Sequence, residues 1–238
     1  MNSYENPGII IQARMGSKRL PGKVMKEIDN KPLIFYLIKR IQLSSIKNIY
    51  LATSEFEEND LIINYINENF PEVIVFRGSE HNVFSRYFEV ANKYNLSTII
   101  RLTADCPLID FRIINMMYEK FISFNPKIDY FSNTTPVEKR TYPDGMDVEI
   151  FSFEALRKAN MLNLTDTELE HVTHCFLNSR HNFKINKIDF KTNLSYLHLS
   201  VDYQHNFDLV EKIIKKLIVY KLDSSLEEIL NILNHEKL

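Results

Sequence analysis

Short apolar runs rich in β-branched residues alternate with segments of helical period through the first half of this chain. Four of the runs are predicted to be strands, at residues 8–13, 48–53, 73–76 and 98–102. Three segments between them are predicted to be helices, at residues 32–43, 60–69 and 83–94. This order is typical of βαβ units, whose right-handed crossovers give a mostly parallel sheet with helices on both faces. Such a sheet binds ligands beyond the carboxyl ends of its strands.

The regular alternation of predicted strands and helices changes after about Asp110. Further helices are predicted at residues 113–124, from 153, at 168–178 and toward the C-terminus. Further strands are predicted near residue 130 and at residues 146–151, 183–188 and 197–201. These strands are expected to add antiparallel pairs, so the sheet is predicted to be mixed. The 238 residues contain no Pro/Gly/Ser-rich linker, and we predict a single domain over residues 1–238.

Composition argues against several classes of protein. No apolar run approaches the roughly 18 to 20 residues that span a bilayer, and the start MNSYENPG lacks the layout of a signal peptide, so we expect a cytoplasmic protein without a membrane partner. Cys106 and Cys175 are too few for a disulfide framework and lack CxxC spacing, so reduced thiols are expected. The 29 basic and 31 acidic residues give a net charge of -2, which argues against a general nucleic-acid binder.

A cationic loop follows the first predicted strand, in the stretch IIIQARMGSKRLPGK. It is not a P-loop, because Gly16 and Gly22 are one residue too far apart for GxxxxGK[ST] and Val24 stands where Ser or Thr is needed. No carboxylate lies between Glu5 and Glu27, whereas that stretch contains five cations: Arg14, Lys18, Arg19, Lys23 and Lys26. This focused positive charge predicts a phosphate-binding loop suited to a triphosphate, with a solvated basic turn as the alternative.

Acidic residues follow two later strands. Asp105 comes shortly after the strand at 98–102, and Asp202 follows the strand at 197–201. The carboxyl ends of parallel strands meet at one edge, so Asp105 is expected beside the cationic loop, where a carboxylate and phosphates together suit magnesium. The pattern alone does not place Asp202 beside Asp105. The alternative for Asp105 is a turn cap, although Asp110 is the better candidate for capping the next helix.

The stretch YPDGMDVEIFS contributes Asp144, Asp147 and Glu149 around a glycine turn. Asp147 and Glu149 are two residues apart and so share one face of a strand, where like charges repel unless a cation or a polar ligand lies between them. An exposed turn followed by an exposed strand face is the alternative.

Two further stretches hold candidate ligand residues. His171 and His174 lie one helical turn apart with Cys175 adjacent, but zinc needs three or four protein ligands and no partners follow at standard spacing, so substrate contact or helix packing is favoured. Gly78 and Ser79 follow the third strand, where backbone groups could contact a base. A plain turn with Ser79 or Asn82 as the helix cap is the alternative there.

Eight motifs occur along the chain in a familiar order: ARMGSKRLPGK, PLIFYLIKRI, LATSE, FRGSEHNVFSRY, RLTADCPLID, YPDGMDVEIFS, EHVT and LSVDY. In this the chain resembles, from Ile9 to about Val210, the cytidylyltransferase-like family of the spore coat polysaccharide biosynthesis type. That family is related to the synthetases of CMP-Kdo and CMP-sialic acids. The resemblance implies a Rossmann-like, three-layer nucleotide-diphosphosugar-transferase fold with a mixed, mostly parallel sheet.

The resemblance also implies roles for individual residues. Catalysis would rest on Arg14, Lys23 and Asp105. The nucleotide would contact Ala13, Arg14, Gly16, Ser17, Lys23, Thr53, Arg77, Gly78, Ser79 and Asp105. Magnesium would be held by Asp105 and Asp202. The acceptor would lie toward Asp144, Asp147, Glu149 and His171. Two departures from the family pattern are Asp29-Asn30 in a turn that usually holds glycines, and SEHN where relatives often carry more acids.

The implied activity is magnesium-dependent transfer of CMP from CTP to a sugar acid or similar small acceptor, with release of pyrophosphate, by a homodimer. A sugar phosphate, a polyol phosphate or a phosphonate stays open as the acceptor. A glycosyltransferase of similar architecture is a rival, although the chain has no Asp-x-Asp and comes closest with Asp147-Val-Glu149. A catalytically silent nucleotide-binding regulator is a further alternative.

Overall fold

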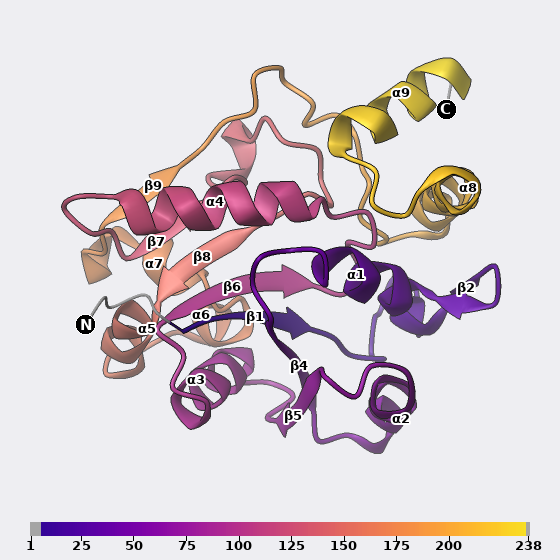
Figure 1. Cartoon of the computed structure of the whole chain (residues 1–238). Coiled ribbons are helices and arrows are strands. Elements are labelled where there is room, and N and C mark those ends of the chain that lie inside the picture. Colours follow the sequence, from indigo (N-terminus) through magenta and orange to yellow (C-terminus); the bar gives the residue numbers. More distant parts are fainter. Residues whose placement is uncertain (1–5, 237–238) are drawn as a thin grey trace.

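A computed structural model of the chain describes residues 6–236, and a seven-stranded sheet lies at its centre (Figure 1). The strand order is β5-β4-β1-β6-β8-β7-β9. The strands are β1 (Pro7–Gln12), β4 (Asn48–Ser54), β5 (Ile74–Gly78), β6 (Thr98–Thr103), β7 (Tyr130–Ser132), β8 (Glu149–Ser152) and β9 (Ile185–Lys187). A small hairpin, β2 (Glu27–Ile28) and β3 (Lys31–Pro32), turns through Asp29 and Asn30, both at positive φ.

The first four strands of the sheet are parallel, as the βαβ pattern predicts. Strand β1 pairs in parallel with β4 and β6, and β4 pairs in parallel with β5. Strand β8 runs antiparallel to both of its neighbours, β6 and β7. The predicted mixed, mostly parallel α/β sheet is therefore confirmed. Ile9, Ile10 and Ile11 of β1 are all buried, because helices cover both faces of a central parallel strand.

Helices occupy both faces of the sheet. Helices α1 (Leu33–Ile41), α4 (Phe111–Ser123), α8 (Gln204–Tyr220) and α9 (Leu226–Glu236) lie over one face, whereas α3 (Val83–Lys93) and α5 (Phe153–Asn160) lie over the other (Figure 1). The remaining helices are α2 (Asp60–Asn69), α6 (Asp166–Glu170) and α7 (His174–Leu177), with single 3-10 turns at η1 (Lys23–Met25), η2 (Glu57–Asn59), η3 (Val137–Lys139) and η4 (Ser179–His181).

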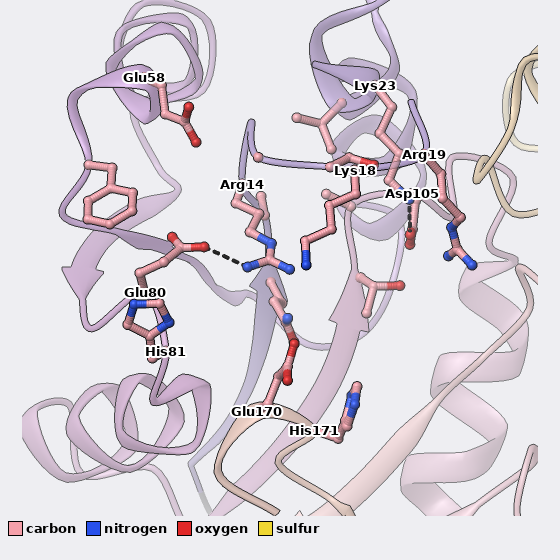
Figure 2. Close-up of a pocket in the computed structure, with 18 of the residues that line it drawn as sticks. Arg14, Lys18, Arg19, Lys23, Glu58, Glu80, His81, Asp105, Glu170 and His171 are labelled. Carbon is pink, nitrogen blue, oxygen red and sulfur yellow. Dashed lines mark hydrogen bonds and ion pairs between the residues drawn. The ribbon is translucent and has the colours of Figure 1, made fainter. Parts of the chain in front are cut away.

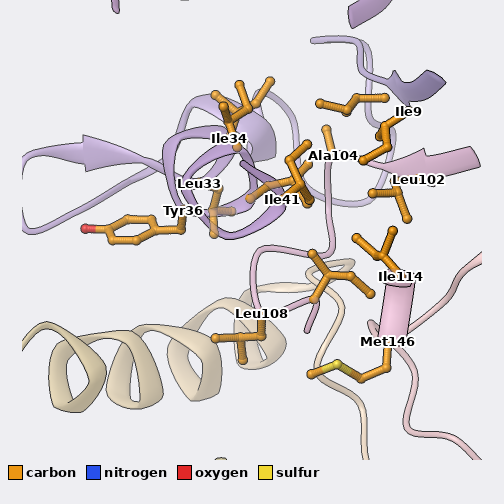
Figure 3. Close-up of a cluster of buried hydrophobic side chains, with 14 of the residues drawn as sticks. Ile9, Leu33, Ile34, Tyr36, Ile41, Leu102, Ala104, Leu108, Ile114 and Met146 are labelled. Carbon is orange, nitrogen blue, oxygen red and sulfur yellow. The ribbon is translucent and has the colours of Figure 1, made fainter. Parts of the chain in front are cut away.

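Each face of the sheet has its own hydrophobic cluster. The larger joins β1 and β6 to α1 and α4, through side chains such as Ile9, Leu102, Ile34 and Ile114 (Figure 3). The smaller includes α3 and α5 and contains the free thiol of Cys175. Both cysteines are buried and unbridged, as predicted. Within residues 6–236, no helix is long and apolar enough to cross a membrane.

Helix caps lie where the sequence places them. The Asp110 carboxylate accepts a hydrogen bond from the backbone N of Arg112 (2.9 Å) at the start of α4. The Asn82 side chain accepts one from the backbone N of Ser85 (2.9 Å) at the start of α3. Both caps satisfy backbone donors that have no partner within the helix.

Two predicted elements differ in the structure. Residues 197–201 were expected to form a strand, but only the bridge between Asp144 and His198 has strand geometry there. The reason is that this segment bonds to two separate loops: the N of Leu199 donates to the O of Asp144 (2.8 Å), and the N of Val201 donates to the O of Asp105 (2.8 Å). The helical stretch expected at 168–178 is broken into α6 and α7 at Val172, which has a φ of 47°.

Hydrogen bonds of Glu168 stabilise the segment that contains α6, the break and α7. Its buried carboxylate accepts hydrogen bonds from the backbone N of Thr165 (2.8 Å), from Asn178 (2.8 Å) and from Arg180 (2.9 Å). Burial alone would raise the pKa of Glu168, but hydrogen bonds with Thr165, Asn178 and His181 lower it to about 2.

The low pKa of Glu168 predicts an acid-sensitive contribution to stability. Because the folded pKa is depressed, the contribution is present above the unfolded value near 4.5 and is lost as the pH falls toward about 2. We expect Glu168→Gln to lower the free energy of unfolding by roughly 1–3 kcal/mol at pH 7 and by less at pH 3. Urea unfolding at the two pH values measures this. Glu170→Gln, at an exposed position two residues away, serves as the control, and an equal loss at both pH values would contradict the prediction.

Candidate functional site

A cleft of about 1210 Å³ opens at the carboxyl ends of β1 and β6 (Figure 2). The loop after β1 forms one side, and the last residue of β6 with the two that follow it, residues 103–105, forms the floor. The loop before α3 and the end of α6 form the opposite walls. The cleft brings together eight of the residues predicted from the sequence: Ala13, Arg14, Gly16, Ser17, Lys23, Asp105, His171 and Asp202.

The loop after β1 is held in place by hydrogen bonds of its backbone. The N of Met15 donates to the side-chain oxygen of Asn59 (2.8 Å), and the buried Asn59 in turn donates to the hydroxyl of Ser54 (2.7 Å). The N of Gly22 donates back to the O of Met15 (3.1 Å). Gly22 has a φ of 66°, which glycine adopts without strain, and this turn directs Lys23 to the floor of the cleft.

Lys23 lies between the two predicted metal ligands. Its ammonium donates to Asp105 (2.6 Å) and to Asp202 (2.9 Å), and its side chain is 11% exposed. Burial would lower the pKa of Lys23, but the two carboxylates raise it above its usual value. Conversely, burial would raise the pKa of Asp105, but Lys23 and Thr103 hold it below its usual value. Both carboxylates thus converge on one cation.

This pair of carboxylates fits a magnesium ion in its donor atoms. Oxygen ligands from one or two carboxylates, completed by phosphate oxygens and water, are what magnesium takes in proteins. Within residues 6–236 there is no group of three or more His, Cys, Asp or Glu side chains arranged to hold a metal ion. A magnesium ion here would therefore need substrate oxygens to complete its coordination. The ammonium group of Lys23 would also have to move away from the two carboxylates.

Other cations of the loop also have acidic partners. Arg14 forms an ion pair with Glu80 (2.5 Å), and Arg19 forms one with Asp202 (2.6 Å). Figure 2 shows Arg14 and Lys18 pointing into the middle of the cleft. The cationic loop therefore faces several carboxylates, and they neutralise part of the positive charge that the sequence suggests.

Several residues of the cleft were not predicted from the sequence. Glu80 lies two residues after the end of β5, just as Asp105 lies two residues after the end of β6, so the signal that identified Asp105 was also present for Glu80. Glu170 projects from the end of α6 beside His171, and both point toward the cationic loop (Figure 2). Glu170 is the last residue of α6, and periodicity does not reveal that the helix ends there, before the break at Val172.

Four residues predicted to surround the nucleotide lie outside the lining of this cleft: Thr53, Arg77, Gly78 and Ser79. The hydroxyl of Thr53 is buried without a hydrogen-bond partner among the described residues. Arg77 pairs with Asp60 (2.6 Å) and donates to the O of Glu55 (2.8 Å). The hydroxyl of Ser79 accepts a hydrogen bond from the N of Asn82 (3.0 Å), so it supports the turn before α3.

The three predicted acceptor carboxylates form a neighbouring group. Arg140 bridges Asp144 (3.5 Å) and Asp147, and Asp144 also accepts a hydrogen bond from Ser200 (2.7 Å). Burial raises the pKa of Asp147 to about 8 against the opposing effect of Arg140. Glu149 is more deeply buried.

Glu149 belongs to an internal network of the sheet. It pairs with Arg101, accepts a hydrogen bond from Tyr130 (2.6 Å), and has its pKa lowered by Arg101 despite burial. The repulsion expected between Glu149 and Asp147 is thus relieved by a separate arginine for each.

The segment at 199–201 connects the predicted acceptor group to the cleft. Its backbone bonds to Asp144 through Leu199 and to Asp105 through Val201, so Asp144 lies close to the carboxylate that pairs with Lys23. Among the described residues, then, the cations of the loop after β1, two converging carboxylates and a second acidic group occupy one edge of the sheet.

A mostly parallel α/β sheet with a basic loop and paired acids at its carboxyl edge defines the class of Rossmann-like nucleotide-binding proteins. Within that class, the chain belongs to the cytidylyltransferase family, whose profile matches residues 8–237. The resemblance inferred from the motifs is confirmed.

Individual relatives agree with the family. The spore coat polysaccharide biosynthesis protein SpsF of Bacillus subtilis is 28% identical over 94% of this chain and 92% of its own. The solved structure of a cytidylyltransferase from Leptospira borgpetersenii has a TM-score of 0.90 at 29% identity, covering 98% of this chain and 95% of its own. The 3-deoxy-manno-octulosonate cytidylyltransferase of Colwellia psychrerythraea is 35% identical over 42% of this chain and 36% of its own.

Proposed function

We propose that this cytidylyltransferase uses magnesium to transfer CMP from CTP to a sugar acid or related acceptor, and that it releases pyrophosphate. One observation carries the proposal: Lys23, the innermost cation of a four-cation cleft, meets Asp105 and Asp202 at the carboxyl edge of the sheet. The name of SpsF supports an acceptor used in polysaccharide biosynthesis, and the name of the 3-deoxy-manno-octulosonate enzyme supports a sugar acid as that acceptor.

The cations act on the leaving group. An oxygen of the acceptor attacks the α-phosphorus, a new P–O bond forms, and the bond between the α-phosphorus and the bridging oxygen breaks, so the electron pair leaves with pyrophosphate. Arg14 and Lys23 would stabilise that charge, and their position in the lining of the cleft supports this role. Such transfer depends on positioning and charge neutralisation.

Magnesium held by Asp105 and Asp202 would supply further positive charge beside the α-phosphate. The proton of an acceptor hydroxyl needs a base, and Asp147 is the candidate because burial brings its pKa to about 8, near neutral pH. An acceptor that is already a phosphate anion needs no such base. His171 and Glu170 face the loop from the opposite wall and would contact the acceptor.

A pyrophosphate-release screen tests this function. Each of CTP, UTP, ATP and GTP is combined with acidic sugars, sugar phosphates, polyol phosphates and phosphonates. We expect release only with CTP and an acidic sugar. Release with another nucleotide would contradict the cytidine assignment, and release with a phosphorylated acceptor would favour the alternative acceptors. A glycosyltransferase or a silent regulator would release no pyrophosphate with any pair. A homodimer and a cytoplasmic location stay predictions.

A further inference from the structure

Arg86 is a buried arginine with an unusual environment. Its side chain, on α3, is 0% exposed, and none of its three guanidinium nitrogens has a hydrogen-bond partner among the described residues. Arg40, buried to a similar degree, differs because it donates to the backbone oxygens of Ile109 (2.8 Å), Leu222 and Ser224 (2.7 Å). A buried charge without a partner is strongly unfavourable, so the position of Arg86 requires an explanation.

Glu80 is the carboxylate that lies near Arg86. The stem of Arg86 packs under the end of β5, where a Cβ built on Gly78 would lie 2.9 Å from its Cγ, and Glu80 follows Gly78 by two residues. Burial would raise the pKa of Glu80, but its interactions with Ser54, Arg14 and Arg86 hold it below its usual value, so it is ionised at neutral pH. The charge of Glu80 is thus shared between a cation in the cleft, Arg14, and a cation behind it, Arg86.

Glu80 pairs with Arg14 in the cleft. The 2.5 Å ion pair takes up an Nη of the guanidinium that would otherwise bind phosphate. A triphosphate entering the cleft must therefore compete with Glu80 for Arg14. Once displaced, the carboxylate would be buried without a cation unless a second one stood ready.

We propose that Glu80 is a positioning residue that exchanges partners: it neutralises Arg14 until phosphate binds there, and it then passes to Arg86. This inference rests on the proposed function in one respect, that the cleft takes a nucleoside triphosphate. It explains two observations together, the Arg14–Glu80 pair and the unpaired guanidinium of Arg86. It also makes the triphosphate the ligand that releases Glu80 from Arg14.

Calorimetric titration of the full chain with CTP and with inorganic tripolyphosphate, both in magnesium buffer, tests the exchange. Glu80→Gln removes the competitor and should lower the Kd for both ligands by about tenfold, since one charge-assisted contact is freed. Glu58→Gln is the matched control. Glu58 lines the same cleft as Glu80, but Glu80 is the residue that pairs with Arg14. It should change the Kd by less than about threefold, as expected of a screened charge. Thermal unfolding verifies that both variants are folded.

Arg86→Met completes a double-mutant cycle. With Glu80 present it should raise the Kd for tripolyphosphate, because the displaced carboxylate then has no second cation. In the Glu80→Gln background it should have no effect on the Kd. Unchanged or weaker binding by Glu80→Gln would overturn the inference, even if Arg86→Met fails to fold. If the wild type binds tripolyphosphate but not CTP, the proposed function is contradicted. The exchange is then still tested by the tripolyphosphate titrations.

Discussion

Replacing Lys23 with alanine is expected to lower the turnover of cytidylyl transfer by about 10²-fold or more. The physical reason is that Lys23 is the innermost cation of the cleft, and one preorganised charge contact contributes about 3 kcal/mol in a transition state. Steady-state kinetics of pyrophosphate release measure the effect. Because the substitution also leaves Asp105 and Asp202 without their shared ammonium, the loss should be accompanied by a lower thermal stability.

Lys26→Ala is the control for Lys23→Ala. It removes the same charge from the same loop, but the Lys26 ammonium lies 4.9 Å from the centre of the Phe207 ring and does not line the cleft. Its turnover should stay within about threefold of wild type. If the Lys23 variant also stays within that range, Lys23 has no part in the reaction.

Asp105→Asn is expected to lower turnover by about 10²-fold and to shift the magnesium titration to higher concentrations. An amide retains the size of the carboxylate but not its charge, so it binds a hard cation weakly. Lys23 keeps its pair with Asp202 in this variant, which separates the loss of a metal ligand from the loss of the cation.

Two measurements check the Asp105 prediction. The first is the dependence of turnover on magnesium, and the second is the calorimetric affinity for CTP with and without magnesium. We expect magnesium to tighten CTP binding in the wild type and to do so less in Asp105→Asn. Asp60→Asn, which removes an acid paired with Arg77 outside the lining of the cleft, should behave as the wild type. An unchanged magnesium titration would exclude Asp105 as a ligand.

The sheet could be predicted because its signal is local. The run Ile9 to Ile11 is apolar at every position, as expected for a strand covered on both faces, and the helices between the strands show clear periodicity. Asp105 could be placed by the same reasoning, since the carboxyl ends of parallel strands share an edge. The caps at Asn82 and Asp110 likewise depend on adjacent residues alone.

The rest of the site depends on contacts that the sequence does not encode locally. Asp202 contacts Lys23 because residues 199–201, just before it, form backbone hydrogen bonds with two loops and not with a strand. Glu170 lines the cleft from the end of α6, and the break that follows at Val172 has a positive φ, which a β-branched residue rarely adopts. The pairing of Arg14 with Glu80 joins residues 66 positions apart. Long-range pairing of this kind is decided by the packed fold.

The most direct test of cytidylyl transfer follows the phosphorus atoms of CTP. CTP labelled at either the α- or the γ-phosphorus is incubated with the acceptor that gives pyrophosphate release, and the products are separated. We predict that the α label appears in a CMP-linked product and the γ label in pyrophosphate. A γ label found in the acceptor, or an α label that stays in CDP or free CMP, would contradict the mechanism.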